Sequence, residues 1–230
     1  MPTAEQELVK EIQKRRSLVG AGRKEIEALA KIHPVLGTAD EIRRLDAKVR
    51  KGIERQRKEI REARKELHDI RHESGQEEAA KWVKKQLGVT ENPPGSNWGH
   101  PVQDWNIWMG YGTPQPWCGI FAGYAACKIG GADVPAPIHI GSAYLLALDA
   151  RANQNGLRAV PVAQCKVGDI FAYGTVHVGF CVRDGLVNGL VEAIEGNTSP
   201  GTEGSQYNGG CVAHKFRPAS MVTTCCRPAY

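Results

Sequence analysis

The chain has 230 residues and a formal net charge of +5, with 30 Lys and Arg against 25 Asp and Glu, so it is long enough for one or two domains. No stretch is apolar over the roughly 20 residues that a membrane-spanning helix needs. The first residues do not show the basic and then apolar pattern of a secretory signal peptide. We therefore expect no membrane span and synthesis in a cytoplasm.

The charge is distributed unevenly along the chain. Residues 1–75 contain 19 of the 30 basic residues and 14 of the 25 acidic ones, which accounts for the whole net charge. They contain no Trp, Tyr, Phe or Cys, whereas all five tryptophans and all seven cysteines follow them. We therefore predict two domains, residues 1–75 and residues 76–230.

The first part predicts a helical hairpin of the coiled-coil kind. Pro34 and Gly37 end a first helix, and Thr38 with Glu41 three residues later has the spacing of a capping box that opens a second one. Each helix carries one narrow apolar stripe, which packs against the other or binds a partner. The stripes are Leu8, Ile12, Val19, Ile26 and Leu29, and then Ile42, Leu45, Val49, Ile53, Ile60, Leu67 and Ile70, with polar Gln56 at an apolar position.

The basic excess of residues 1–75 has two interpretations. It can be a solvated helix face, or it can attract an anionic surface such as teichoic acid, lipid or nucleic acid. No aromatic residue is available there to stack on bases, so we expect no nucleic acid as partner. Two possibilities therefore stay open for residues 1–75: binding to an anionic wall polymer, and self-association.

Cys118 follows Pro116 and Trp117 and begins an apolar, small-residue run that reaches Ala126. Proline is tolerated at the start of a helix, so this pattern predicts a helix with Cys118 in its first turn. The free amides and the dipole at that end favour a negatively charged sulfur, which is the nucleophilic form of cysteine. The alternative is that Cys118 is one more small buried residue.

Three predicted strands follow. Residues 167–182 form two of them around a Gly-Thr turn, and alternation places His177 and Gly179 on the same face. A third strand over residues 189–198 places Glu195 and Asn197 on one face. Either could orient the imidazole nitrogen of His177 that does not face the sulfur. A histidine alone in a strand is more often structural, but the ordered set favours catalysis.

Between about residues 76 and 218 the sequence resembles the CHAP domains of peptidoglycan-cleaving cysteine amidases and endopeptidases, within the wider NlpC/P60 group. The resemblance implies an α+β, papain-like core in which helices pack on an antiparallel sheet. It also implies that Cys118 is the nucleophile, His177 the base and Glu195 the orienting residue, with Asn197 second to it or sharing that role. The motifs are Gly95-Ser96-Asn97, Trp105, Pro116-Trp117-Cys118, Val167-Gly168-Asp169-Ile170, His177-Val178-Gly179, Ile194-Glu195-Gly196-Asn197-Thr198 and Phe216-Arg217-Pro218.

Two departures from this family bear on the site. Some CHAP domains have an aspartate-rich calcium loop before the cysteine, but here Asp104 stands alone, and no Cys or His spacing indicates zinc. We therefore expect no metal and no cofactor. Trp117 stands where those relatives have glutamine, which leaves Gln115 as a weak candidate for the oxyanion hole. We expect Trp117, Gln115 and Trp105 to contact substrate, although such tryptophans are more often packing residues.

The other six cysteines are expected to be free thiols, with Cys127 and Cys181 in the core and Cys225 and Cys226 unexplained. A helix over residues 138–150 is expected beside the cleft.

The sequence thus predicts a metal-independent cysteine hydrolase that cleaves an amide in a peptidoglycan stem or cross-bridge peptide. As a phage endolysin it would stay in the host cytoplasm until it is released to the wall; alternatively it would travel in a virion. Two other classes stay open: a tail-associated structural or wall-penetrating module, and a papain-like peptidase that acts on proteins.

Overall fold

The computed structural model describes residues 3–32, 39–135 and 137–230. The predicted break at Pro34 and Gly37 and the capping residue Thr38 lie outside the described residues, as do the side chains of Leu29, Glu41 and Ile42. The chain divides into two compact units, Met1–Arg71 and His72–Tyr230. In the described parts, no helix is both long enough and apolar enough to cross a membrane.

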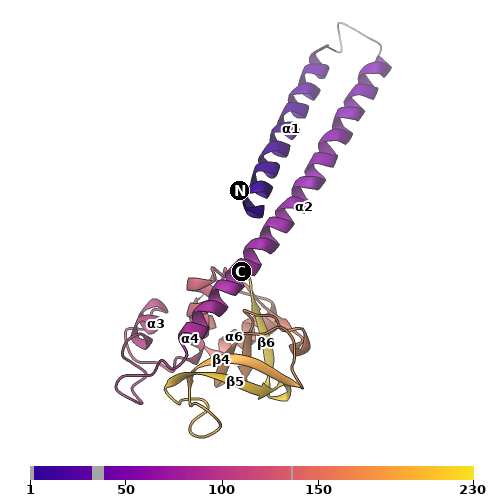
Figure 1. Cartoon of the computed structure of the whole chain (residues 1–230). Coiled ribbons are helices and arrows are strands. Elements are labelled where there is room, and N and C mark those ends of the chain that lie inside the picture. Colours follow the sequence, from indigo (N-terminus) through magenta and orange to yellow (C-terminus); the bar gives the residue numbers. More distant parts are fainter. Residues whose placement is uncertain (1–2, 33–38, 136) are drawn as a thin grey trace. The chain divides into compact units, whose positions relative to one another are not determined.

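The first unit contains two antiparallel helices, α1 (Ala4–Ile32) and the larger part of α2 (Ala39–Lys85) (Figure 1). Ile12 and Ile60 are buried between them. Gln56, the polar residue of the predicted apolar stripe, accepts a hydrogen bond of 3.1 Å from Arg15, which also forms an ion pair with Glu59. This polar cross-link explains why the stripe is interrupted at that position.

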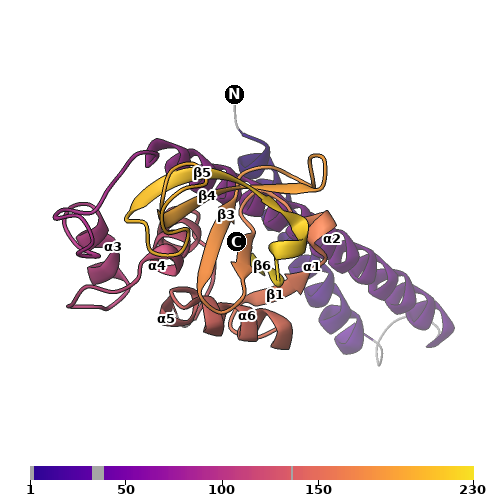
Figure 2. The ribbon, with the colours of Figure 1, turned by 90° about the horizontal axis from the view of Figure 1, so that it is seen from below.

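The end of α2 belongs to the second unit, so the charge-based boundary at residue 75 falls within one continuous helix. The second unit is α+β, with short helices packed on one six-stranded antiparallel sheet of order β1-β6-β2-β3-β4-β5 (Figure 2). The helices are α3 (Val102–Trp108), α4 (Cys118–Gly123), the π-helix η1 (Tyr124–Ile129), α5 (Pro137–Ile140), α6 (Ala143–Ala152) and the 3₁₀ turns η2 (Val162–Gln164) and η3 (Ala219–Met221). The strands are β1 (Leu157–Val160), β2 (Ile170–Tyr173), β3 (His177–Cys181), β4 (Leu190–Thr198), β5 (Cys211–Pro218) and β6 (Thr224–Pro228).

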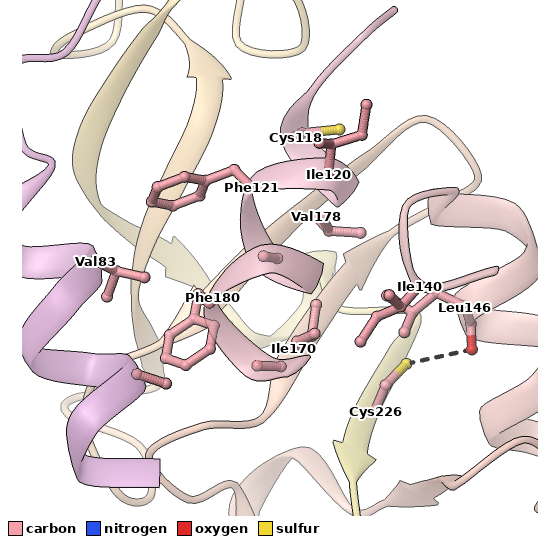
Figure 3. Packing of buried hydrophobic residues seen from close by; sticks show 14 of the residues in the cluster. Val83, Cys118, Ile120, Phe121, Ile140, Leu146, Ile170, Val178, Phe180 and Cys226 are labelled. Carbon is pink, nitrogen blue, oxygen red and sulfur yellow. Dashed lines mark hydrogen bonds between the residues drawn. The ribbon is translucent and has the colours of Figure 1, made fainter. Parts of the chain in front are cut away.

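Helix α4 packs on β3 and β4, and its Phe121 belongs to the same buried cluster as Val178 and Phe180 of β3 (Figure 3). It continues as a π-helix, so the single helix predicted after Cys118 changes its hydrogen-bonding pattern at Tyr124. The helix predicted over residues 138–150 is likewise two helices, because Ser142 caps α6 by accepting a hydrogen bond from the backbone of Leu145.

The two adjacent cysteines of β6 point to opposite faces of the sheet, as alternation in a strand requires. Cys226 lies in the helix-covered core, where its sulfur is 3.9 Å from the carbonyl of Leu146 (Figure 3). Cys225 packs in a second cluster on the other face, with Cys165 and Cys181. Both residues therefore serve packing, which the sequence alone did not explain. Cys181 is buried as predicted, whereas Cys127 is only half-buried.

Candidate active site

Cys118 is the first residue of α4 and is 5% exposed. Its sulfur lies 3.9 Å from the carbonyl oxygen of Val176, the residue before His177. The start of the helix therefore meets the turn between β2 and β3. The first four backbone N–H groups of a helix have no hydrogen-bond partner within that helix. The backbone N–H of Cys118 can therefore donate a hydrogen bond to a substrate group that lies next to the sulfur.

His177 opens β3 and is fully buried. Its Nε2 lies 2.9 Å from Oε2 of Glu195 in β4, while its Nδ1 has no hydrogen-bond partner among the described residues. The ring of Tyr173 stacks on the imidazole at 5.9 Å between centroids, and the ring of Tyr207 meets it edge-on at 5.7 Å. One nitrogen is thus held by a carboxylate and the other is available.

Gly179 makes room for this arrangement. A Cβ at this position would lie 2.9 Å from the Tyr173 hydroxyl and 3.0 Å from Cγ of Glu195. The face that alternation predicted for His177 and Gly179 is therefore filled by the side chains of the neighbouring strands. A larger residue at 179 would displace the carboxylate that holds His177.

The charges of the site support one another. Burial alone would lower the pKa of His177, but its interactions with Cys118 and Glu195 outweigh that effect and raise the pKa to about 9. Burial would raise the pKa of Glu195, but hydrogen bonds from Arg217 and His177 bring it below its ordinary value. Both directions favour an imidazolium paired with a carboxylate.

Arg217 is a member of the site that the sequence reasoning did not assign. From β5 its Nε donates to Oε1 of Glu195 at 2.9 Å and its Nη2 to Oε2 at 2.6 Å. The guanidinium carbon also lies 5.7 Å from the centroid of the Tyr173 ring. A usable signal was present, because Arg217 occupies an inward-facing position in the alternating run of residues 211–218.

Asn197 does not hydrogen-bond to His177, contrary to the expectation that it could share the orienting role. Its Nδ2 donates to Asn97 at 3.2 Å and to Asn208 at 3.0 Å, and its Oδ1 accepts from the backbone N–H of Gly210 at 3.2 Å. The cause is a register shift in β4 after Glu195, where Asn197 takes a φ of 54°. Simple alternation from Glu195 fails at such a bulge.

Of the three predicted substrate contacts, the two tryptophans are buried. Trp117 is fully buried and its indole N–H donates to Oε1 of Glu91 at 2.8 Å. Trp105 is 3% exposed and packs against Trp117 and Phe121. Both indoles therefore belong to the core, because their large apolar area is better stabilised there than in an open wall. Gln115 is half-buried, and its amide donates to Thr113 at 3.2 Å.

Asp104, which stands alone in the sequence, is hydrogen-bonded to His100 at 2.8 Å. Within the described residues, no group of three or more His, Cys, Asp or Glu is arranged to hold a metal ion.

No family model matches the chain, and no curated protein matches it. One similar solved structure is the crystal structure of the wild-type endolysin LysIME-EF1, with 18% sequence identity and a TM-score of 0.42. The similarity covers 67% of this chain and 64% of that one, so the chain spans less than two thirds of that endolysin's length. A likeness at this level establishes neither a shared activity nor a shared substrate.

Proposed function

We propose that the chain is a cysteine hydrolase that cleaves an amide bond of bacterial peptidoglycan. The observation that carries the proposal is the group of Cys118 at a helix start, His177 buried beside it and Glu195 bonded at 2.9 Å to the far nitrogen of the imidazole. Nucleophile, base and orienting residue in this relation are the signature of thiol catalysis. Peptidoglycan as substrate rests on the CHAP-like motifs.

The mechanism follows from these positions. The Cys118 thiolate, paired with the His177 imidazolium, attacks the amide carbonyl, and the backbone N–H of Cys118 stabilises the oxyanion. His177 then protonates the leaving amine, which releases it and leaves a thioester. Water, deprotonated by His177, hydrolyses the thioester and restores the thiol. Glu195 keeps the ring in place and stabilises its charge throughout.

The finer fold assignment, a papain-like CHAP core, belongs to the same proposal. It is supported by a helix that begins with the candidate nucleophile and packs on the antiparallel strands that carry the candidate base. The domain role of residues 76–230 as the hydrolase follows from it.

A direct test uses purified sacculi. We expect the protein to clear a sacculus suspension and to release fragments whose new termini, read by mass spectrometry, identify the cleaved bond. Cys118→Ala should abolish clearing, whereas Cys127→Ala, in the π-helix after α4, should retain it. Release of peptides from casein without attack on sacculi would instead identify a protein peptidase, and no cleavage of either would favour a structural module.

For the helical hairpin the proposal is attraction to an anionic wall polymer. Residues 43–58 contain eight basic residues and two acidic ones, so the positive charge is concentrated there. Lys48, Lys51, Arg55 and Lys58 are spaced by three and four residues, which places them along one face of α2. All four are exposed and line one groove, together with Arg61 and one acidic residue, Glu54. A linear row of cations suits a polymer with repeated negative charges.

A further inference from the structure

The sheet of the second unit contains two buried arginine–carboxylate pairs of the same design. Arg217 binds both oxygens of Glu195, at 2.9 and 2.6 Å, and Arg227 binds both oxygens of Asp169, at 2.8 Å each. Both carboxylates are completely buried, and both arginine side chains are 11% exposed. The pair of Arg217 and Glu195 contacts His177 and the pair of Arg227 and Asp169 does not. The second pair can therefore serve as a control for the first.

We propose that Arg217 is a positioning residue of the candidate active site, which holds the Glu195 carboxylate against Nε2 of His177 by binding both of its oxygens. The inference rests on the proposed function, because it extends the Cys118, His177 and Glu195 set by one residue.

The geometry explains why such a residue is needed. Oε2 of Glu195 is shared between His177 and Arg217, whereas Oε1 accepts from Arg217. A glutamate side chain has several rotatable bonds, and a single hydrogen bond to the imidazole does not fix the plane of its carboxylate. The planar guanidinium fork does, because it makes two parallel bonds to the two oxygens.

Tyr173 joins the same assembly from the other side. Its ring stacks on His177 and lies under the guanidinium of Arg217. Movement of Arg217 would therefore disturb both groups that hold the imidazole, Glu195 and Tyr173. A lysine at position 217 could keep the charge but not the fork.

The charges that face the site predict a pH signature. His177 is faced by Cys118, Glu195, Tyr173 and Tyr207. Glu195 is faced by Arg217, His177, Tyr173 and Lys215. Burial pushes the pKa of Glu195 upward, and the hydrogen bonds from Arg217 oppose this. Without Arg217, Glu195 takes up a proton at a higher pH, and a neutral Glu195 stabilises the His177 imidazolium less. The pH range in which His177 supports the reaction of Cys118 with an alkylating reagent then begins at a higher pH.

The experiment measures alkylation of Cys118 by iodoacetamide as a function of pH, with each cysteine followed by peptide mass spectrometry. Burial raises the pKa of Cys127 and of Cys226 to about 12, so these thiols react slowly. For Arg217→Gln we expect the acid limb of the profile to move up by about one pH unit, with a roughly tenfold lower rate near pH 6 and recovery near pH 9. Arg217→Lys should fall between this variant and the wild type.

Arg227→Gln is the matched control, because it removes an equivalent buried pair that does not touch His177. An unchanged profile for Arg217→Gln, or equal shifts in both variants, would overturn the proposal. If Arg217→Gln does not fold, the double variant Arg217→Gln/Glu195→Gln removes both buried charges together. It should match Glu195→Gln alone, since Arg217 acts through Glu195; an additional shift would contradict this.

Alkylation needs no peptidoglycan, so these outcomes are independent of whether sacculi are the substrate. A shifted profile in a protein that leaves sacculi intact would support the role of Arg217 and reject the proposed substrate.

Discussion

Glu195 is the residue on which the candidate site depends most. It receives hydrogen bonds from β3 and β5 through His177 and Arg217, and it is completely buried. A buried carboxylate with these partners orients the imidazole and stabilises its positive charge. Replacing Glu195 by glutamine removes the negative charge but keeps the shape of the side chain, so it isolates the effect of the charge on His177.

We therefore expect Glu195→Gln to lower the rate of sacculus clearing by roughly a hundredfold, the scale at which a misplaced base reduces turnover. Glu192→Gln is the control on the same strand, because Glu192 pairs with His214 near the surface. Rates are compared at equal concentrations of folded protein. A Glu195→Gln enzyme with near wild-type turnover would contradict the assignment.

Asn197 has a different expected role. Its side chain joins Asn97, Asn208 and Gly210, which lie in two separate loops. Asn197→Ala should lower the free energy of unfolding by about 1–3 kcal/mol, because buried polar partners lose their bonds, and it should reduce turnover less than Glu195→Gln does. Denaturant unfolding and clearing rates measure the two effects. A stable but inactive Asn197→Ala protein would instead indicate a Cys118, His177 and Asn197 triad.

The order of motifs was sufficient to place Cys118, His177 and Glu195 at the start of a helix, the start of a strand and within the next strand. It was not sufficient for side chains whose partners are distant in sequence. Trp117 is held inside the core by Glu91, 26 residues before it, and Asn197 by Asn97, 100 residues before it. Local patterns carry no signal of such tertiary contacts.

Among the elements, α4 depends on a close backbone approach. A Cβ on Gly119 would lie 2.3 Å from the carbonyl oxygen of Gly141, a backbone atom that cannot turn away. Gly119→Ala should therefore lower the free energy of unfolding by about 1–3 kcal/mol through overpacking. It should also displace Cys118, the residue before it. Thermal unfolding and iodoacetamide alkylation measure the two effects.

Gly112→Ala is the control for this substitution, since no atom lies within 4 Å of a Cβ at that position. Equal stability of the two variants would contradict this prediction, because it would show that α4 can move away from Gly141 without loss of stability.

The predicted helices deviate from the observed ones at two places. The runs after Cys118 and after Ile138 are apolar and helical in pattern, and the strands over β2, β3 and β4 were predicted at nearly their observed positions. The break at Gly141 and Ser142 and the change to a π-helix at Tyr124 depend on tertiary packing. Helical periodicity cannot indicate either.

At the scale of the whole molecule, the free energy of unfolding should depend on pH through the buried pair of His177 and Glu195. His177 has a raised pKa, so it stabilises the fold fully below its ordinary value of 6.5, and this contribution is lost as the pH rises through about 9. Glu195 has a lowered pKa, so it stabilises the fold above its ordinary value of 4.5 and loses this effect as the pH falls. We expect a stability maximum between these ordinary values. Thermal unfolding from pH 3 to 10 should show it, and Glu195→Gln should flatten both limbs.

The uneven charge of the chain leads to the last prediction, which concerns binding to the wall. Attraction between a cation row and an anionic polymer releases counterions, so it weakens as salt rises. In a Cys118→Ala background, which leaves walls intact, the full chain should sediment with walls that carry teichoic acid. It should do so less with stripped walls, and less at about 300 mM than at about 50 mM NaCl.

Two triple variants change the net charge by the same amount but at different positions. Comparing them shows whether wall binding depends on where the charges lie or only on the total charge. Lys48→Gln/Lys51→Gln/Arg55→Gln removes three of the four exposed cations of the row on α2, and Lys10→Gln/Lys14→Gln/Arg16→Gln removes three exposed charges from α1. Glutamine keeps a good helix propensity in both. The α2 variant should lose binding severalfold more, because its cations are contiguous along one face. Equal losses would attribute binding to net charge alone, and salt-independent sedimentation would reject an electrostatic role for the hairpin and favour its self-association.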